Sequence, residues 1–192
     1  MTTAIQEAPP ATTKQSHPRL TAEEFFAKHE KDRVELVRGI VKEMPMPDAL
    51  HGFICSQIAR YLANFAEAEQ LGRVMCNDSF VKFPEDSVLG PDVFFISYTK
   101  LPKGKIPRGL LEIIPELVVE IRSPSDLWTE IISKTLDYLA AGVTAVMVVN
   151  PEREAVAVYR SAMEEQHFSI DQELTLPDVL PGFTLPVRKL FE

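Results

Sequence analysis

The stretch Pro115–Lys134, PELVVEIRSPSDLWTEIISK, decides the fold that we predict for this chain. Its apolar run from Leu117 to Ile121 is rich in strong β formers, which is the pattern of a strand covered on both faces. Pro124 prevents a simple continuation of that strand, and a helix is predicted from about Asp126 to Ala141. We therefore expect an α/β fold in which a mixed, twisted sheet is flanked by helices.

The same strand carries a charged residue, Glu120, inside its apolar run. Burying an unpaired charge is costly, so a carboxylate at such a position usually has a partner, often a cation or a metal ion. Because side chains alternate along a strand, Glu120 and Arg122 are predicted to project from the same face. The helix that follows carries Lys134. A carboxylate, a tight turn and a lysine in this order form a candidate catalytic corner.

A second acidic residue, Asp92, stands at the start of a strand predicted in the sequence LGPDVFFI. Gly90-Pro91 predicts a turn, and the strand covers Asp92 to Ile96. Two acids on neighbouring strands can share one divalent cation, and Mg²⁺ is typically held by one or two protein carboxylates together with waters and substrate phosphate oxygens. Asp92 and Glu120 are therefore the candidate ligands for Mg²⁺ or Mn²⁺.

Pro91-Asp92 followed by Glu120-Ile121-Arg122 resembles the PD-(D/E)XK nuclease signature, with arginine in the final position. Longer blocks are similar, in order, to the Uma-two family of predicted restriction endonucleases: RVELVRGIVKEMPMPDALHG, GPDVFFI, PELVVEIRSPSD, KTLDYLAAGVTAVMVVNPEREAVAVYR and LPGFTLPVRKLF. The similarity runs from about Leu20 to Phe191. It implies a restriction-endonuclease-like mixed β-sheet flanked by helices, with an added N-terminal hairpin, and a metal-dependent endodeoxyribonuclease activity.

The family pattern also implies the roles of the site residues. Its two acids, matched here by Asp92 and Glu120, bind the metal, and a lysine near the second acid orients water or stabilises charge. Arg122 stands in the position of that lysine, where it can stabilise phosphate charge but cannot act as a base. Lys134 on the next helix is the natural substitute.

Simpler interpretations of these residues remain open at this point. Lys134 could pair with Glu130, four residues earlier on its own helix. It could also form a purely structural ion pair with Glu120. Asp92 could merely begin its strand.

Three further residues are candidate accessory groups. Glu35 lies in RVELVRGIVKEMP, which predicts a hairpin with Arg38-Gly39 at its turn, and it matches an acid of the family's first hairpin. His51 and Gln57 belong to a helix predicted from His51 to Glu69 by an apolar stripe. The resemblance places this helix where the fold often lends a polar residue to the metal site. Alternatively, Glu35 faces solvent and His51 is a helix cap or a hydrogen-bonding residue.

The most basic window of the chain lies in the irregular stretch SYTKLPKGKIPRGLLEIIPE. Its cations are candidate contacts to DNA phosphates: Lys100, Lys103, Lys105 and Arg108. The alternative is a solvated loop.

The remaining segments are predicted to complete the sheet. Leu71-Gly72 is expected to end the first long helix. A single strand is predicted from Val74 to Phe83, and residues 85–91 are predicted to form a loop. Further strands are expected at Val143–Val149, Ala155–Tyr159 and Phe168–Leu176.

Bulk properties indicate one globular domain. The chain has 192 residues, and we predict a disordered tail over residues 1–18 and a single domain over residues 19–192. The formal net charge of −8 argues against non-specific coating of DNA, so DNA binding would need a local basic patch or a partner subunit. The sequence shows no secretory signal, no run of the roughly 18 apolar residues that span a membrane, and no disulfide framework, which suits a cytoplasmic location.

The leading interpretation is a Mg²⁺- or Mn²⁺-dependent endonuclease that hydrolyses DNA phosphodiester bonds. A homodimer is expected because a two-stranded target favours symmetry, and no membrane association is expected. One alternative is a catalytically silent nucleic-acid-binding or regulatory module on the same fold. Another is a metal-dependent hydrolase of a different phosphoester.

Overall fold

The computed structural model describes residues 19–192, except for residues 30–31, 78 and 105. The predicted tail at residues 1–18 and the candidate DNA contact Lys105 therefore lie outside the described residues. The helices are α1 (Ala22–His29), α2 (Ala49–Ala68) and α3 (Trp128–Ala140), with the 3₁₀ segments η1 (Pro151–Arg153) and η2 (Val187–Leu190). The strands are β1 (Val34–Val37), β2 (Ile40–Glu43), β3 (Gly72–Cys76), β4 (Val81–Phe83), β5 (Ser87–Leu89), β6 (Val93–Ser97), β7 (Leu117–Ile121), β8 (Ala145–Asn150), β9 (Ala155–Ser161), β10 (Glu164–Phe168), β11 (Glu173–Thr175) and β12 (Thr184–Pro186).

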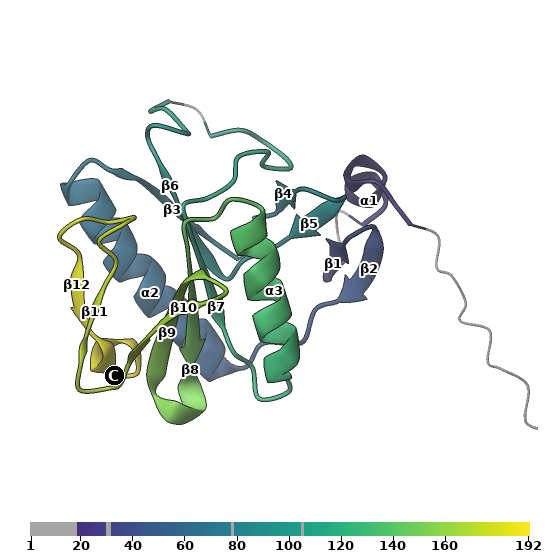
Figure 1. Cartoon of the computed structure of the whole chain (residues 1–192). Helices are drawn as coiled ribbons and strands as arrows, with labels where there is room; N and C mark the ends of the chain where they lie inside the picture. The colour runs from purple at the N-terminus through teal and green to yellow at the C-terminus, as the bar shows by residue number, and fades with distance from the viewer. Residues whose placement is uncertain (1–18, 30–31, 78, 105) are drawn as a thin grey trace, which may run out of the picture.

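A six-stranded mixed sheet, in the order β10-β9-β8-β7-β6-β3, forms the centre of the molecule. Strands β7 and β8 run parallel, whereas the other neighbouring pairs of this sheet are antiparallel. A parallel pair needs a crossover connection, and α3 provides it. Helix α2 covers one face of the sheet and α3 covers the other (Figure 1). The predicted α/β architecture, a mixed sheet flanked by helices, is confirmed.

Alternation along β7 assigns its side chains to two separate cores. Leu117, Val119 and Ile121 belong to the apolar cluster that includes α2. Val118 belongs to the cluster that includes α3. Every position of the strand is buried, as its apolar sequence predicts. By the same alternation Glu120 lies on the α3 face, so the helix that follows the strand covers its carboxylate.

A second, four-stranded sheet in the order β2-β1-β5-β4 stands beside α3 (Figure 1). Its β1–β2 hairpin turns at Arg38 and Gly39, which both have positive φ, so the predicted N-terminal hairpin is confirmed. Helix α1 begins with a capping box in which Thr21 and Glu24 exchange backbone-to-side-chain hydrogen bonds. A small apolar cluster packs α1 against this sheet: Ala22, Phe25, Leu36 and Val88.

Several predictions for the middle and the end of the chain are wrong. The strand predicted from Val74 to Phe83 is two strands, β3 and β4, which belong to different sheets. The loop predicted at residues 85–91 contains β5, which pairs with β1 and β4. The strand predicted from Phe168 to Leu176 divides into the end of β10 and the separate β11. In each case the strand bounds follow from the pairing partners of each strand, which differ along the predicted stretch.

Gly72 has a different role from the predicted helix terminator. Helix α2 ends at Ala68, and Gln70 takes the left-handed conformation with φ of 54°. Gly72 instead opens β3, where an added Cβ would lie 2.2 Å from the carbonyl oxygen of Ile96. The close approach of the neighbouring strand therefore requires glycine at this position.

The C-terminal segment completes the core on the α2 face. Strands β11 and β12 form a two-stranded sheet beside α2, and η2 buries Val187 and Leu190 (Figure 1). Within the described part of the chain, none of the helices combines the length and apolarity that a bilayer span requires.

Candidate active site

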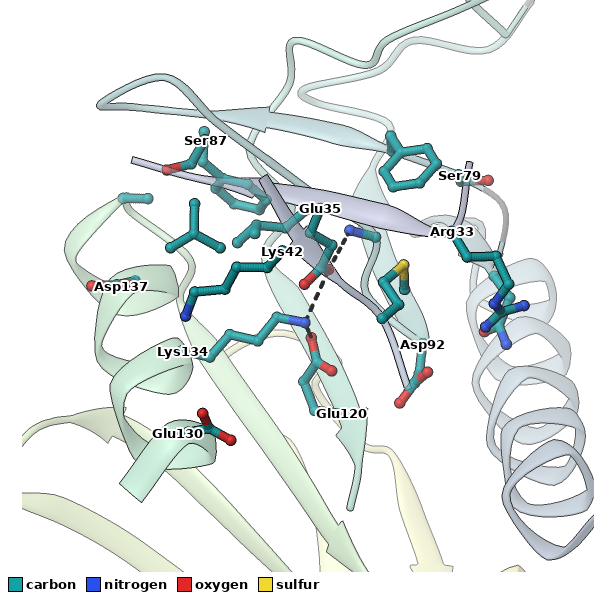
Figure 2. Close-up of a pocket in the computed structure, with 18 of the residues that line it drawn as sticks. Arg33, Glu35, Lys42, Ser79, Ser87, Asp92, Glu120, Glu130, Lys134 and Asp137 are labelled. Atoms are coloured by element: carbon teal, nitrogen blue, oxygen red, sulfur yellow. Dashed lines mark hydrogen bonds and ion pairs between the residues drawn. The ribbon is translucent and has the colours of Figure 1, made fainter. Parts of the chain in front are cut away.

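A cleft of about 1070 Å³ lies where the N-terminal sheet faces α3 and the ends of β6 and β7. Figure 2 shows charged side chains entering it from both sides. Glu35 comes from β1, Asp92 from the residue before β6, Glu120 from β7, and Lys134 from α3. Four segments that are distant in sequence therefore meet at one place.

Strand register brings the two predicted metal ligands together. Strands β6 and β7 pair antiparallel with Val93 opposite Val119, so Asp92, which precedes Val93, lies beside the end of β7 that carries Glu120 and Ile121. Asp92 Oδ2 accepts a hydrogen bond of 2.7 Å from the backbone amide of Ile121. Both carboxylates line the cleft. The negative charge of Asp92 also contributes to the raised pKa of Glu120, so the two carboxylates are neighbours; that they share one ion stays a prediction.

Lys134 lies between two carboxylates (Figure 2). Its Nζ is 3.0 Å from Glu35 Oε1 and 3.1 Å from Glu120 Oε1. One helical turn further along α3, the buried hydroxyl of Tyr138 donates a 2.6 Å hydrogen bond to the same Glu120 oxygen. Lys134 thus pairs with Glu35 and Glu120, and no ion pair to Glu130 occurs among the described residues.

The burial of this cluster changes its protonation. Burial raises the pKa of Glu120 from 4.5 to about 7, an increase that Asp92 and Glu35 reinforce and that Lys134 and Tyr138 limit. Burial lowers the pKa of Lys134, but the negative charges of Glu120 and Glu35 outweigh it and hold this pKa above its ordinary value. Lys134 therefore remains a cation near neutral pH, while Glu120 is near its titration midpoint.

The oxygen atoms of the cluster suit a hard divalent cation. Oε1 of Glu35 accepts hydrogen bonds from Lys134 and from the Gly90 amide, whereas Oε2 of Glu35 and of Glu120 accepts none from any described residue. The cleft is lined by nine acidic but only five basic side chains, His51 included, so a cation would relieve net repulsion. Carboxylate oxygens are the ligands that Mg²⁺ and Mn²⁺ prefer. The residues present thus fit the predicted ion.

His51 reaches the cluster from the first turn of α2. Its Nε2 lies 3.0 Å from Asp92 Oδ1, and the N-cap residue Asp48 accepts a hydrogen bond from its backbone amide. The hydrogen bond to Asp92, with a further contribution from Cys55, raises the pKa of His51 to about 10. A His51 ring nitrogen, the Cys55 Sγ and an Asp92 carboxylate oxygen all lie within 4.8 Å of one another.

Two residues of the site, Tyr138 and Cys55, were not predicted from the sequence. Each follows a predicted site residue by four positions on the same helix, Tyr138 after Lys134 and Cys55 after His51. Residues four apart lie on one helix face. This spacing is the signal that could have identified them.

Two predicted residues lie outside the cleft. Arg122 lines a separate hollow of about 100 Å³. It donates a 2.6 Å hydrogen bond to Glu152, and its guanidinium lies 5.3 Å from the centroid of the Trp128 ring. Strand β7 ends at Ile121, so the alternation that predicted a shared face with Glu120 no longer applies at Arg122. Gln57 donates to the backbone carbonyl of Glu192, at 2.9 Å, and does not line the cleft.

The predicted basic segment borders the cleft, but its described cations, Lys100, Lys103 and Arg108, do not line it. Ile106, Pro107 and Gly109 are part of the cleft lining. Lys100 pairs with Glu116 at 3.7 Å, and Lys103 contacts Gln70 and the Tyr98 ring. Arg108 is exposed.

Comparison with known proteins identifies the family and the fold of this chain. The family model Uma2, described as "Putative restriction endonuclease", matches residues 21–188. Among solved structures, a protein from Anabaena variabilis ATCC 29413, described as "a putative nuclease belonging to DUF820", is similar with a TM-score of 0.80 and 24% identity, over 90% of this chain and 97% of that chain. No match was found among curated proteins. Because this family model matches residues 21–188, which is most of the chain, the chain belongs to the Uma2 family.

Proposed function

We propose that the protein is a divalent-metal-dependent endonuclease that hydrolyses DNA phosphodiester bonds. The observation that carries this proposal is the meeting of Glu35, Asp92, Glu120 and Lys134 in one cleft. The descriptions of the family and of the Anabaena protein support a nuclease. The charge of the cleft supports a metal requirement, because nine acidic side chains would repel a polyanion unless cations were bound.

The carboxylates are assigned to cation binding. Asp92 and Glu120 would hold Mg²⁺ or Mn²⁺, with Glu35 as the adjacent acid. The ion, when bound, neutralises phosphate charge and favours ionisation of the attacking water. Tyr138 and Lys134 both contact Oε1 of Glu120, whereas Oε2 accepts no hydrogen bond from the described residues and could bind the ion.

Lys134 is assigned to electrostatic stabilisation rather than proton abstraction. Glu120 and Glu35 hold its pKa above the ordinary value, so it stays protonated. A protonated lysine can donate hydrogen bonds to a phosphate oxygen and stabilise the charge that develops in the transition state. Arg122 is given no step, because it lies in a separate hollow.

Two further parts of the proposal concern DNA. The segment with Lys100, Lys103 and Arg108 borders the cleft, so we assign it contacts to phosphates that flank the cut site. A homodimer would present two such clefts to the two strands of a duplex. Light scattering of the full chain measures the oligomeric state.

The experiment compares wild type, Lys134→Ala, Lys134→Arg and the control Lys28→Ala in cleavage of plasmid and linear DNA. Lys28 is exposed on α1 and does not line the cleft. Wild-type cleavage should need Mg²⁺ or Mn²⁺ and stop with EDTA. Lys134→Ala should lose roughly 10²-fold or more in rate, the scale of one positioned catalytic group. Lys134→Arg should recover part of this loss because it keeps the charge.

Other outcomes would contradict the proposal in distinct ways. Cation-dependent DNA binding without cleavage by the wild type would indicate a catalytically silent module. Cleavage of small phosphoesters alone would indicate a different hydrolase. Unchanged cleavage by Lys134→Ala would mean that this lysine is structural. Thermal unfolding of each variant is the control, because Lys134→Ala leaves two buried carboxylates without their cation.

A further inference from the structure

His51, Cys55 and Asp92 form a second group of metal-ligating side chains beside the carboxylate cluster. One ligand atom from each lies within 4.8 Å of the other two. The three come from two segments of the chain: His51 and Cys55 from α2, and Asp92 from the residue preceding β6. We propose that they form a site for a thiophilic divalent ion of the Zn²⁺ class, separate from the Mg²⁺ site but sharing Asp92 with it.

Local structure prepares the site. His51 and Cys55 are four residues apart on α2 and so lie on one helix face. The hydrogen bond from the His51 amide to Asp48 fixes the first turn. Cys55 is packed in the apolar core at 6% exposure, which limits the motion of its sulfur. Asp92 is held by the Ile121 amide. All three donors are therefore positioned by other contacts.

An unpartnered buried atom points to a ligand. The His51 side chain is only 10% exposed, and its Nδ1 is buried without a hydrogen-bond partner among the described residues. Buried polar atoms almost always have partners, so such an atom needs an explanation. With Nε2 already beside Asp92 and Cys55 four positions along the helix, the ring has metal-ligating groups around it.

The donor types select the ion. Thiolate and imidazole ligands favour Zn²⁺ and related transition metals, whereas Mg²⁺ prefers oxygen ligands only. Glu35 and Glu120 provide oxygen donors alone, so the two clusters differ in preference. His51 and Asp92 line the cleft, so an ion here would be reachable from it.

Sharing Asp92 makes the two ions competitors. An ion held by His51, Cys55 and Asp92 would occupy the Asp92 carboxylate, whose negative charge acts on Glu120 in the absence of an ion. Zn²⁺ should therefore inhibit Mg²⁺-dependent cleavage. This consequence rests on the proposed function, but the binding site itself does not.

Binding is tested with Co²⁺, which reports thiolate coordination by a sulfur-to-metal charge-transfer band. The full chain should show this band and lose it on addition of Zn²⁺ but not of excess Mg²⁺. Cys55→Ala and His51→Gln should weaken Co²⁺ binding at least about 10²-fold, since even outer-shell changes at metal sites cost 10–100-fold. The control is Cys76→Ala, because Cys76 is the exposed cysteine and lies outside the cluster.

Three results would overturn the site: no charge-transfer band in the wild type, a band that survives Cys55→Ala, or a band that disappears in Cys76→Ala. These measurements do not depend on nuclease activity, so an inactive but Co²⁺-binding protein would refute only the proposed function. If the protein cleaves DNA, Zn²⁺ should inhibit the wild type at least about 10-fold more strongly than Cys55→Ala. Equal inhibition of both would refute the competition.

Discussion

Replacing Glu120 by glutamine should change how stability depends on pH. Burial raises the pKa of Glu120 from 4.5 to about 7 in the folded protein, whereas the unfolded chain should keep the ordinary value. Between these two values the folded state therefore binds a proton that the unfolded state has released. Stability contributed by this group is present at low pH and is lost as pH rises through the window.

The size of the effect follows from the separation of the two pKa values. A separation from 4.5 to about 7 corresponds to about 3 kcal/mol once pH exceeds the folded value. Glutamine cannot ionise, so the wild type should lose up to this amount relative to Glu120→Gln between pH 4.5 and about pH 7. Because a cation stabilises the ionised carboxylate, Mg²⁺ should reduce the loss in the wild type only.

Urea unfolding from pH 4 to pH 8, with and without Mg²⁺, measures the difference between wild type and variant. Using this difference removes the contributions of other titrating groups, such as His51. The control is Glu67→Gln, which changes an exposed glutamate on α2 that lies outside the cleft. A difference in unfolding free energy that stays constant with pH would refute the protonation assigned to Glu120. A Mg²⁺ effect that persists in Glu120→Gln would refute its role as a ligand.

Three further predictions test individual contacts. Tyr138→Phe removes the 2.6 Å hydrogen bond to Glu120 and should lower the unfolding free energy by about 1–3 kcal/mol above pH 7, measured by urea unfolding. Gly72→Ala places a Cβ 2.2 Å from a backbone oxygen and should destabilise the protein by about 1–3 kcal/mol or more. Gly52→Ala, with open space around it, should stabilise α2 by about 0.5–1 kcal/mol. Similar melting temperatures of the two variants would contradict this prediction. Lys103→Ala should weaken DNA binding for all sequences alike and lower the salt slope by about 1, measured by fluorescence anisotropy at several salt concentrations.

Local patterns in the sequence were sufficient for much of the architecture. The apolar run Leu117–Ile121 predicted a buried central strand with its bounds, and the turn at Arg38-Gly39 predicted the hairpin. The start of α1 is likewise set locally, by the capping box between Thr21 and Glu24. These features depend on residues within a few positions of one another, so the chain specifies them without distant partners. The resemblance to a known family, which the family match confirms, added the expected sheet and the pairing of Asp92 with Glu120 in one site.

Tertiary structure decided the features that depend on distant segments. The division of residues 74–83 between two sheets follows from the separate partners of β3 and β4. The Arg122 side chain points away from the cleft because β7 ends at Ile121 and because Glu152 accepts its hydrogen bond. Lys134 was predicted as a site residue, but its contact with Glu35 joins residues 99 positions apart. Helix periodicity places Cys55 beside His51, but Asp92 joins them only because α2 packs against the end of β6. Side-chain alternation and helix periodicity fix directions only within one element, so which elements meet depends on how the cores pack.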